Sequence, residues 1–206
     1  QIVDAAAEDL VKTLTRRFAE PVDWMVVDHY GIDADTEGMY RSLARNIMVI
    51  DDLADRPHDC DLLLDQAPGR DSDDYAGLVP AHADVLAGPG YALLDPAYGE
   101  YRDRDLPGKS HRRASIFVSF GATDPRNFTV RGLDALEGAA LAGPVNVVLG
   151  AAAPHREAVR TRLKAWDTEA NLHIDTAEII QLLADSMLAV GAGGVSALER
   201  CCCGVP

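Results

Sequence analysis

Short apolar segments alternate with longer amphipathic segments along the chain, and this alternation limits the fold more than any other feature. Bounded by turn residues, the apolar segments predict buried strands at residues 24–27, 46–50, 61–64, 84–87, 115–119, 145–149, 171–174 and 187–190. Apolar residues at helical spacing predict helices at residues 2–19, 36–45, 125–136, 154–166, 177–184 and 195–203. Strands that alternate with helices form parallel sheets covered on both faces. The sequence therefore predicts an α/β fold.

The alternation stops once, between Pro96 and Arg113, where charged residues, proline and glycine are frequent and periodicity is weak. We interpret this segment as a linker between two Rossmann-like domains, residues 1–105 and 106–206. The chain starts at Gln1 inside a helical pattern and stops at Pro206, where the pattern of a new strand begins. We therefore expect both domains to be incomplete and the chain to be an internal fragment.

A formal net charge of −14 argues against nucleic acid and anionic membranes as partners. The sequence contains neither a signal peptide nor an apolar run of the ~18 residues that a membrane span needs, so we expect a cytoplasmic monomer. Its cysteines, Cys60 and the run Cys201 to Cys203, lack metal-ligand spacing, because neighbouring helical residues point about 100° apart. We interpret them as small buried side chains and expect neither a metal nor a cofactor.

Polar side chains follow several of the expected strands. In "WMVVDHYGID" the strand leads into Asp28, His29 and Tyr30, and the next strands lead into Asp51-Asp52 and Asp65. Ligands of open α/β sheets bind beyond the carboxyl ends of the strands, so we expect a cleft between the two domains. Two interpretations remain open for the aspartates after residue 50, a cation site or a solvated acidic loop with turn caps, and we favour the second.

The segment "AVGAGGVSALER" is a strand that ends in a glycine-rich turn and opens a helix. Gly191, Gly193 and Gly194 allow the backbone to approach a ligand, and the helix N-terminus offers free N–H groups to a diphosphate. Ser196 adds a hydroxyl, and Glu199 can accept hydrogen bonds from two sugar hydroxyls. A purely structural turn would use the same glycines.

A second strand–loop–helix junction reads "VSFGATDP". Gly121 permits a tight turn, Thr123 offers a hydroxyl, and Asp124 before Pro125 is suited to cap a helix that begins at the proline. A well-capped helix without a ligand would have the same sequence. Two such loops in one sheet together predict a phosphate-binding site.

Six blocks occur in order over nearly the whole chain: "DWMVVDHYGID", "VIDDLADRPHDCDLLLDQ", "YAGLVP", "GPGYALLDP", "VSFGATDP" and "GAGGVSALERCCCGVP". Together they resemble the UDP-2,4-diacetamido-2,4,6-trideoxy-beta-L-altropyranose hydrolases of pseudaminic acid biosynthesis. The resemblance implies a two-domain GT-B fold and hydrolysis of a UDP-sugar. Water would attack the anomeric carbon with inversion, UDP would leave, and no metal would take part.

The resemblance also implies roles for particular residues. UDP would lie on the C-terminal domain, with Glu199 on the ribose, Tyr30 would assist at the sugar, and the diphosphate would be surrounded by Gly121, Ala122, Thr123, Gly193, Gly194 and Ser196. The family's presumed base, a histidine in a Gly-His-x-x-Arg loop, and its Asn-Gln motif are not in this sequence, and His29 does not replace that base. The resemblance therefore implies an inactive fragment. Because Asp95-Pro-Ala-Tyr98 departs from the family pattern, we assign no sugar contact there.

Two further functions fit the same residues. A GT-B glycosyltransferase would use the same UDP-sugar site and pass the sugar to an acceptor instead of water. A non-catalytic nucleotide-sugar binding module would keep the site and lack the chemistry.

Overall fold

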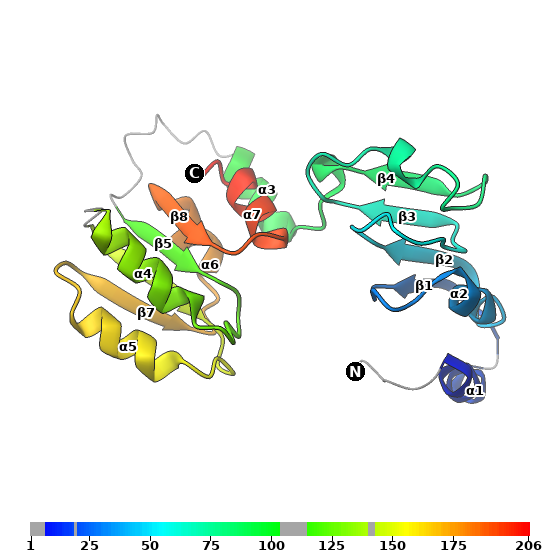
Figure 1. Ribbon diagram of the computed structural model, residues 1–206, viewed down its shortest axis with the longest axis horizontal. Helices are drawn as coiled ribbons and strands as arrows, with labels where there is room; N and C mark the ends of the chain where they lie inside the picture. Colours follow the sequence, from blue (N-terminus) through cyan, green and yellow to red (C-terminus); the bar gives the residue numbers. More distant parts are fainter. Residues whose placement is uncertain (1–6, 19, 104–114, 140–142) are drawn as a thin grey trace. The chain divides into compact units, whose positions relative to one another are not determined.

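The computed structural model describes residues 7–18, 20–103, 115–139 and 143–206, and the chain forms two compact units, Gln1–Leu93 and Leu94–Pro206 (Figure 1). Each unit is an α/β domain with a four-stranded parallel sheet, which confirms the predicted α/β class. The expected boundary between residues 105 and 106 lies outside the described residues. None of the described helices is long and apolar enough to cross a lipid bilayer.

The first unit contains a parallel sheet whose strands follow the order of the sequence: β1 (Val22–Val27), β2 (Ala44–Ile50), β3 (Leu62–Asp65) and β4 (Asp84–Ala87). Its helices are α1 (Ala7–Arg17), α2 (Ala34–Tyr40) and the short 3₁₀ turns η1 (Ser72–Tyr75) and η2 (Pro89–Tyr91). Helix α2 ends at Tyr40, earlier than expected, because Leu43 and Ala44 are buried and Ala44 already pairs with β1.

Strand β1 is less buried than the sequence predicts. It is the edge strand of its sheet, and its side chains alternate between two faces. Met25 and Val27 pack into the core, whereas Trp24 and Val26 are 50 % and 58 % exposed. An unbroken apolar run is typical of a fully buried strand, so the sequence alone could not reveal this half-exposed position.

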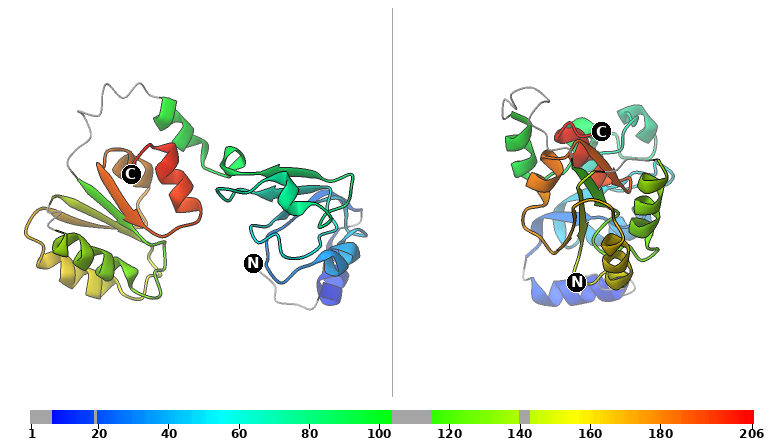
Figure 2. Two further views of the ribbon diagram at one scale, coloured as in Figure 1. Left: turned by 45° about the horizontal axis from the view of Figure 1, so that its top comes forward. Right: turned by 90° about the vertical axis from the view of Figure 1, so that its left-hand side faces the viewer.

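The second unit contains strands β5 (Ile116–Ser119), β6 (Val145–Leu149), β7 (Ala170–Ile174) and β8 (Leu188–Gly191), in the spatial order β7-β6-β5-β8. Its helices are α3 (Pro96–Asp103), α4 (Phe128–Gly138), α5 (Arg156–Lys164), α6 (Ile179–Ala184) and α7 (Val195–Cys202). Helices α4 and α5 cover one face of the sheet, and α3, α6 and α7 cover the other (Figures 1 and 2). The sheet of this unit therefore has a core on both faces.

The linker interpretation was wrong for its first part, because Pro96–Asp103 is helix α3 and belongs to the second unit. Tyr98 is 3 % exposed and Tyr101 packs beside it, so these side chains anchor the helix against α6 and α7. Charged neighbours hide this short apolar stripe in the sequence. The rest of the expected linker, from residue 104 on, lies outside the described residues.

The cysteines also differ in part from expectation. Cys60 and Cys203 are buried, but Cys201 is exposed and Cys202 is intermediate. Successive residues of a helix turn by about 100°, so neighbouring side chains cannot all face one core.

Candidate functional site

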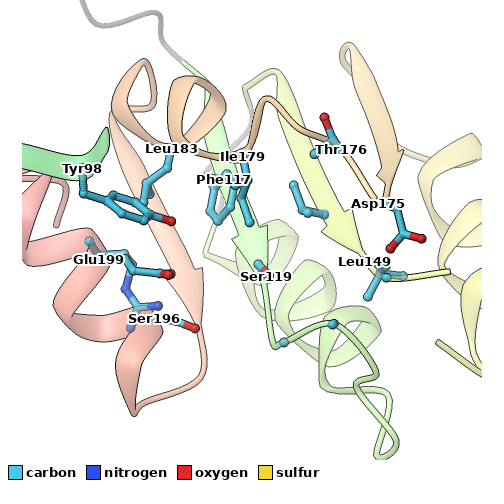
Figure 3. Close-up of a pocket in the computed structure, with 15 residues that line it drawn as sticks. Tyr98, Phe117, Ser119, Leu149, Asp175, Thr176, Ile179, Leu183, Ser196 and Glu199 are labelled. Carbon is cyan, nitrogen blue, oxygen red and sulfur yellow. The ribbon is translucent and has the colours of Figure 1, made fainter. Parts of the chain in front are cut away.

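A cavity of about 310 Å³ opens at the carboxyl end of the second sheet, where the chain leaves β5, β6, β7 and β8 (Figure 3). Parallel α/β sheets bind ligands at this end. The volume lies at the lower end of the range for small-molecule sites. All of its lining residues belong to the second unit.

The floor of the cavity is apolar. Phe117 and Val148 project from β5 and β6 on the face opposite α4 and α5, and Leu183 of α6 packs beside them. All three residues are buried. This floor offers a dry surface to a planar or apolar part of a ligand.

One wall is formed by helix α7, which contributes Ser196, Glu199 and Arg200 and follows the glycine-rich turn after β8. Gly194 occupies the N-cap position with φ 74°, and no side chain caps the helix there. Gly191 lies against β5, where a Cβ atom would collide with the Ser119 carbonyl oxygen. Arg200 stabilises the turn, because its Nη2 donates a hydrogen bond to the Ala192 carbonyl oxygen at 2.9 Å. The first amides of α7 are therefore not used by a capping side chain, and Ser196 lines the cavity beside them.

The loop after β5 differs from expectation in one respect. Helix α4 begins at Phe128 after Asn127, not at Pro125. Asp124 nevertheless caps it, because its carboxylate oxygens accept hydrogen bonds from the amides of Phe128 and Thr129, both at 2.8 Å. Asp124 is 3 % exposed. The start of α4 is therefore filled by a carboxylate of the chain itself, as expected for Asp124. The diphosphate-binding role expected for this loop stays a prediction.

The backbone before Asp124 still faces the cavity. Gly121 has φ 96°, which favours glycine, and both Gly121 and Ala122 line the cavity. The Gly150 amide donates to the Ala122 carbonyl oxygen at 2.7 Å and ties this loop to the end of β6. A side chain at Gly150 would press on that carbonyl oxygen, with its Cβ 2.8 Å away. Of this loop, only backbone and small side chains can contact a ligand.

Glu199 and Tyr98 lie on the same side of the cavity as Ser196 (Figure 3). The Tyr98 hydroxyl lies close enough to the Glu199 carboxylate to be affected by its charge. Burial, followed by the charge of Glu199, raises the pKa of Tyr98. The tyrosine thus stays protonated at neutral pH, and its hydroxyl can donate a hydrogen bond.

Asp175 and Thr176 form the opposite side of the cavity, directly after β7 (Figure 3). Asp175 has φ 48°, a left-handed conformation that aspartate tolerates better than most residues. Its Oδ1 accepts a hydrogen bond from the Ala151 amide at 2.9 Å, which joins the ends of β6 and β7. Asp175 and Thr176 were not predicted as site residues, although they follow a predicted strand directly, as Asp28 and Asp65 do.

No protein-family model matches the chain. A search of curated proteins finds a UDP-2,4-diacetamido-2,4,6-trideoxy-beta-L-altropyranose hydrolase of Campylobacter jejuni, 27 % identical over 132 residues. The chain resembles this hydrolase, as predicted. The match covers 63 % of this chain and 46 % of the hydrolase.

Two further relatives match. The spore coat polysaccharide biosynthesis protein SpsG of Bacillus subtilis is 31 % identical over 62 % of this chain and 38 % of its own length. An uncharacterized protein of Methanocaldococcus jannaschii is 21 % identical over 89 % of this chain and 39 % of its own length. The matches thus span less than half the length of each of these relatives.

The structure places four of the seven expected UDP-binding residues around one cavity. Gly121, Ala122, Ser196 and Glu199 line it, whereas Thr123, Gly193 and Gly194 lie outside its lining. This common location does not by itself test the binding of UDP, so the assignment of all seven residues stays a prediction.

Tyr30 lies in the first unit, directly after β1, and is 64 % exposed. Its hydroxyl donates to Asp52 Oδ2 at 3.4 Å. That hydrogen bond, with the negative charges of Asp52, Asp28 and Asp51, raises the pKa of Tyr30. His29 accepts the Gly31 amide on its Nδ1 at 3.0 Å, so one ring nitrogen has a local partner. The catalytic role expected for Tyr30 stays a prediction.

Asp52 and Asp55 are exposed, as expected for a solvated acidic loop, whereas Asp51 caps the turn and is only 2 % exposed. Its Oδ2 accepts the amides of Leu53 and Ala54 and the Tyr75 hydroxyl, and Arg56 pairs with its other oxygen at 2.8 Å. Burial alone would raise the pKa of Asp51, but these hydrogen bonds and the charge of Arg56 outweigh it and lower the pKa. Within the described residues, no group of three or more His, Cys, Asp or Glu side chains is placed to hold a metal ion.

Proposed function

We propose that this chain forms the UDP-binding part of a nucleotide-sugar hydrolase of GT-B type. The observation that carries the proposal is the position of Ser196, in the uncapped first turn of α7, and of Glu199 around one cavity at the carboxyl end of a parallel sheet. The resemblance to a UDP-sugar hydrolase supports the choice of UDP.

The chemistry of the cavity suits the three parts of UDP. The free amides and partial positive charge at the start of α7, with the Ser196 hydroxyl, would bind the diphosphate. Glu199 would accept hydrogen bonds from the ribose hydroxyls. The apolar floor of Phe117, Val148 and Leu183 would lie against the pyrimidine.

The same arrangement would assist the departure of UDP. Negative charge grows on the diphosphate as the bond to the anomeric carbon breaks, and amides fixed at a helix start stabilise that charge without having to reorient. Water would attack the anomeric carbon, with Tyr30 assisting. Because residues 1–206 contain no Gly-His-x-x-Arg sequence, we expect them to bind UDP without hydrolysing the sugar nucleotide.

The second candidate is a GT-B glycosyltransferase. The name of the Bacillus relative gives a polysaccharide pathway and not a hydrolysis, so transfer of the sugar to an acceptor is a real alternative. Both reactions share the UDP site and differ in what attacks the anomeric carbon. A binding module without catalysis is the third candidate.

Calorimetric titration of the chain with UDP, UMP, uridine and ADP tests the proposal. We expect UDP to bind more tightly than UMP and UMP more tightly than uridine, because each phosphate adds contacts at α7. Uridine that binds as tightly as UDP would contradict a diphosphate site at α7, and ADP that binds as tightly as UDP would contradict the choice of base. For a longer protein that contains these residues, UDP release without any acceptor separates the hydrolase from the glycosyltransferase and from the binding module.

A further inference from the structure

Tyr98 is a buried side chain whose polar end lies at the cavity. It comes from α3, which packs between α6 and α7, and only 3 % of its surface is exposed. Figure 3 shows its ring on the side of the cavity that holds Glu199 and Ser196. A buried tyrosine hydroxyl needs a hydrogen-bond partner, and the Glu199 carboxylate is a charged acceptor that lies near it in the cavity lining.

Glu199 is a flexible side chain, and its usefulness to a ligand depends on where its carboxylate points. A tyrosine hydroxyl donates one hydrogen bond, whereas an ionised carboxylate has about four lone-pair positions. One hydrogen bond from a rigid buried ring would therefore orient the carboxylate and leave most of its accepting capacity free. Two adjacent hydroxyls of a sugar could use that capacity.

We propose that Tyr98 positions Glu199 for the recognition of a vicinal diol in the cavity. This inference rests on the proposed binding of UDP, whose ribose supplies the diol. Tyr98 acts through Glu199 and is a positioning residue. The ring packs in the same apolar cluster as Phe117 and Leu183, so the hydroxyl and the ring have separate roles.

Tyr98→Phe separates these roles, because it removes the hydroxyl and keeps the buried ring. The matched control is Tyr101→Phe on the same helix, whose hydroxyl donates to Gln181 and which lies outside the lining of the cavity. Each variant is titrated with UDP and with 2′,3′-dideoxy-UDP, which has no diol. Circular dichroism checks that both variants are folded.

We expect Tyr98→Phe to weaken UDP binding about 5- to 10-fold, the effect of one hydrogen bond that orients a charged group. The affinity for dideoxy-UDP should stay within about twofold of the unchanged chain, and Tyr101→Phe should change neither ligand. An equal loss for both ligands would overturn the inference, since it would show a general change in the cavity. Unchanged UDP affinity in Tyr98→Phe would also overturn it.

Glu199→Ala distinguishes a failure of this inference from a failure of the proposed function. If Glu199→Ala weakens UDP binding and Tyr98→Phe does not, UDP binds as proposed and only the role of Tyr98 is wrong. If Glu199→Ala leaves the affinity for UDP unchanged, Glu199 does not hold the ribose and both the site and the inference fail.

Discussion

Replacement of Glu199 with alanine addresses the centre of the proposed UDP site. Glu199 lines the cavity within α7, near the turn that carries Ser196, and the Tyr98 hydroxyl lies near its carboxylate. Loss of a hydrogen bond to a charged group costs ~1.5–3 kcal/mol, and water partly replaces it in an open cavity. We therefore expect the binding of UDP to weaken by roughly 1–3 kcal/mol, which is about 5- to 150-fold in Kd.

Isothermal titration calorimetry at neutral pH measures this change directly. Glu157→Ala is a matched control, because Glu157 lies on α5, outside the lining of the cavity, and its nearest cation, Arg160, is 3.7 Å away. A thermal melt of each variant separates loss of binding from loss of folding, since Glu199→Ala removes the partner of the buried Tyr98 hydroxyl. A Kd for UDP that stays equal to that of the Glu157→Ala control would refute the reasoning and remove Glu199 from the site.

Three further changes test other parts of the structure. Asp124→Ala should destabilise the second unit by about 1–3 kcal/mol in a denaturant titration, because two amides of α4 lose their cap; no loss would mean that the cap is not needed. Because folding lowers the pKa of Asp51, its ionised carboxylate stabilises the fold at pH values above the ordinary aspartate pKa near 4, and this stabilisation should be lost as the pH falls through the lowered pKa. Asp51→Asn should therefore make the melting temperature depend less on pH in the acid range. An unchanged pH dependence would contradict this role of Asp51. Tyr30→Phe, in a longer protein that hydrolyses the sugar nucleotide, should lower kcat more than it raises KM, whereas an equal kcat would leave Tyr30 without a catalytic role.

Strands were easier to predict than the other elements. The expected strands at residues 84–87 and 145–149 coincide with β4 and β6, because apolar runs between turn residues are a local signal. The start of α4 was harder, since Asp124 caps the helix from four residues before Phe128 and the backbone at Asn127 adopts φ 53°. Helix α3 was missed because only tertiary packing makes a core residue of Tyr98.

Residues of the candidate site were predicted unevenly for a related reason. Ser196 and Glu199 stand in a glycine-rich strand–turn–helix sequence, which indicates an anion site by itself. Nothing local marks Tyr98 as a partner of Glu199, because their contact depends on the packing of α3 against α7. Asp175 directly follows strand β7, but only the strand order of the sheet shows that β7 ends at the cavity, next to β6.

The sequence by itself determined the α/β class, most of the strands and the glycine-rich turn before α7, because periodicity and turn chemistry depend on residues close together in the chain. Only the tertiary structure decided which strand ends meet. The order β7-β6-β5-β8 brings Gly121, Asp175 and Glu199 to one cavity, and that order depends on long-range packing on both faces of the sheet. The structure also shows that Asp124, predicted to cap a helix at Pro125, caps one that begins three residues later, at Phe128, whereas the start of α7 has no side-chain cap.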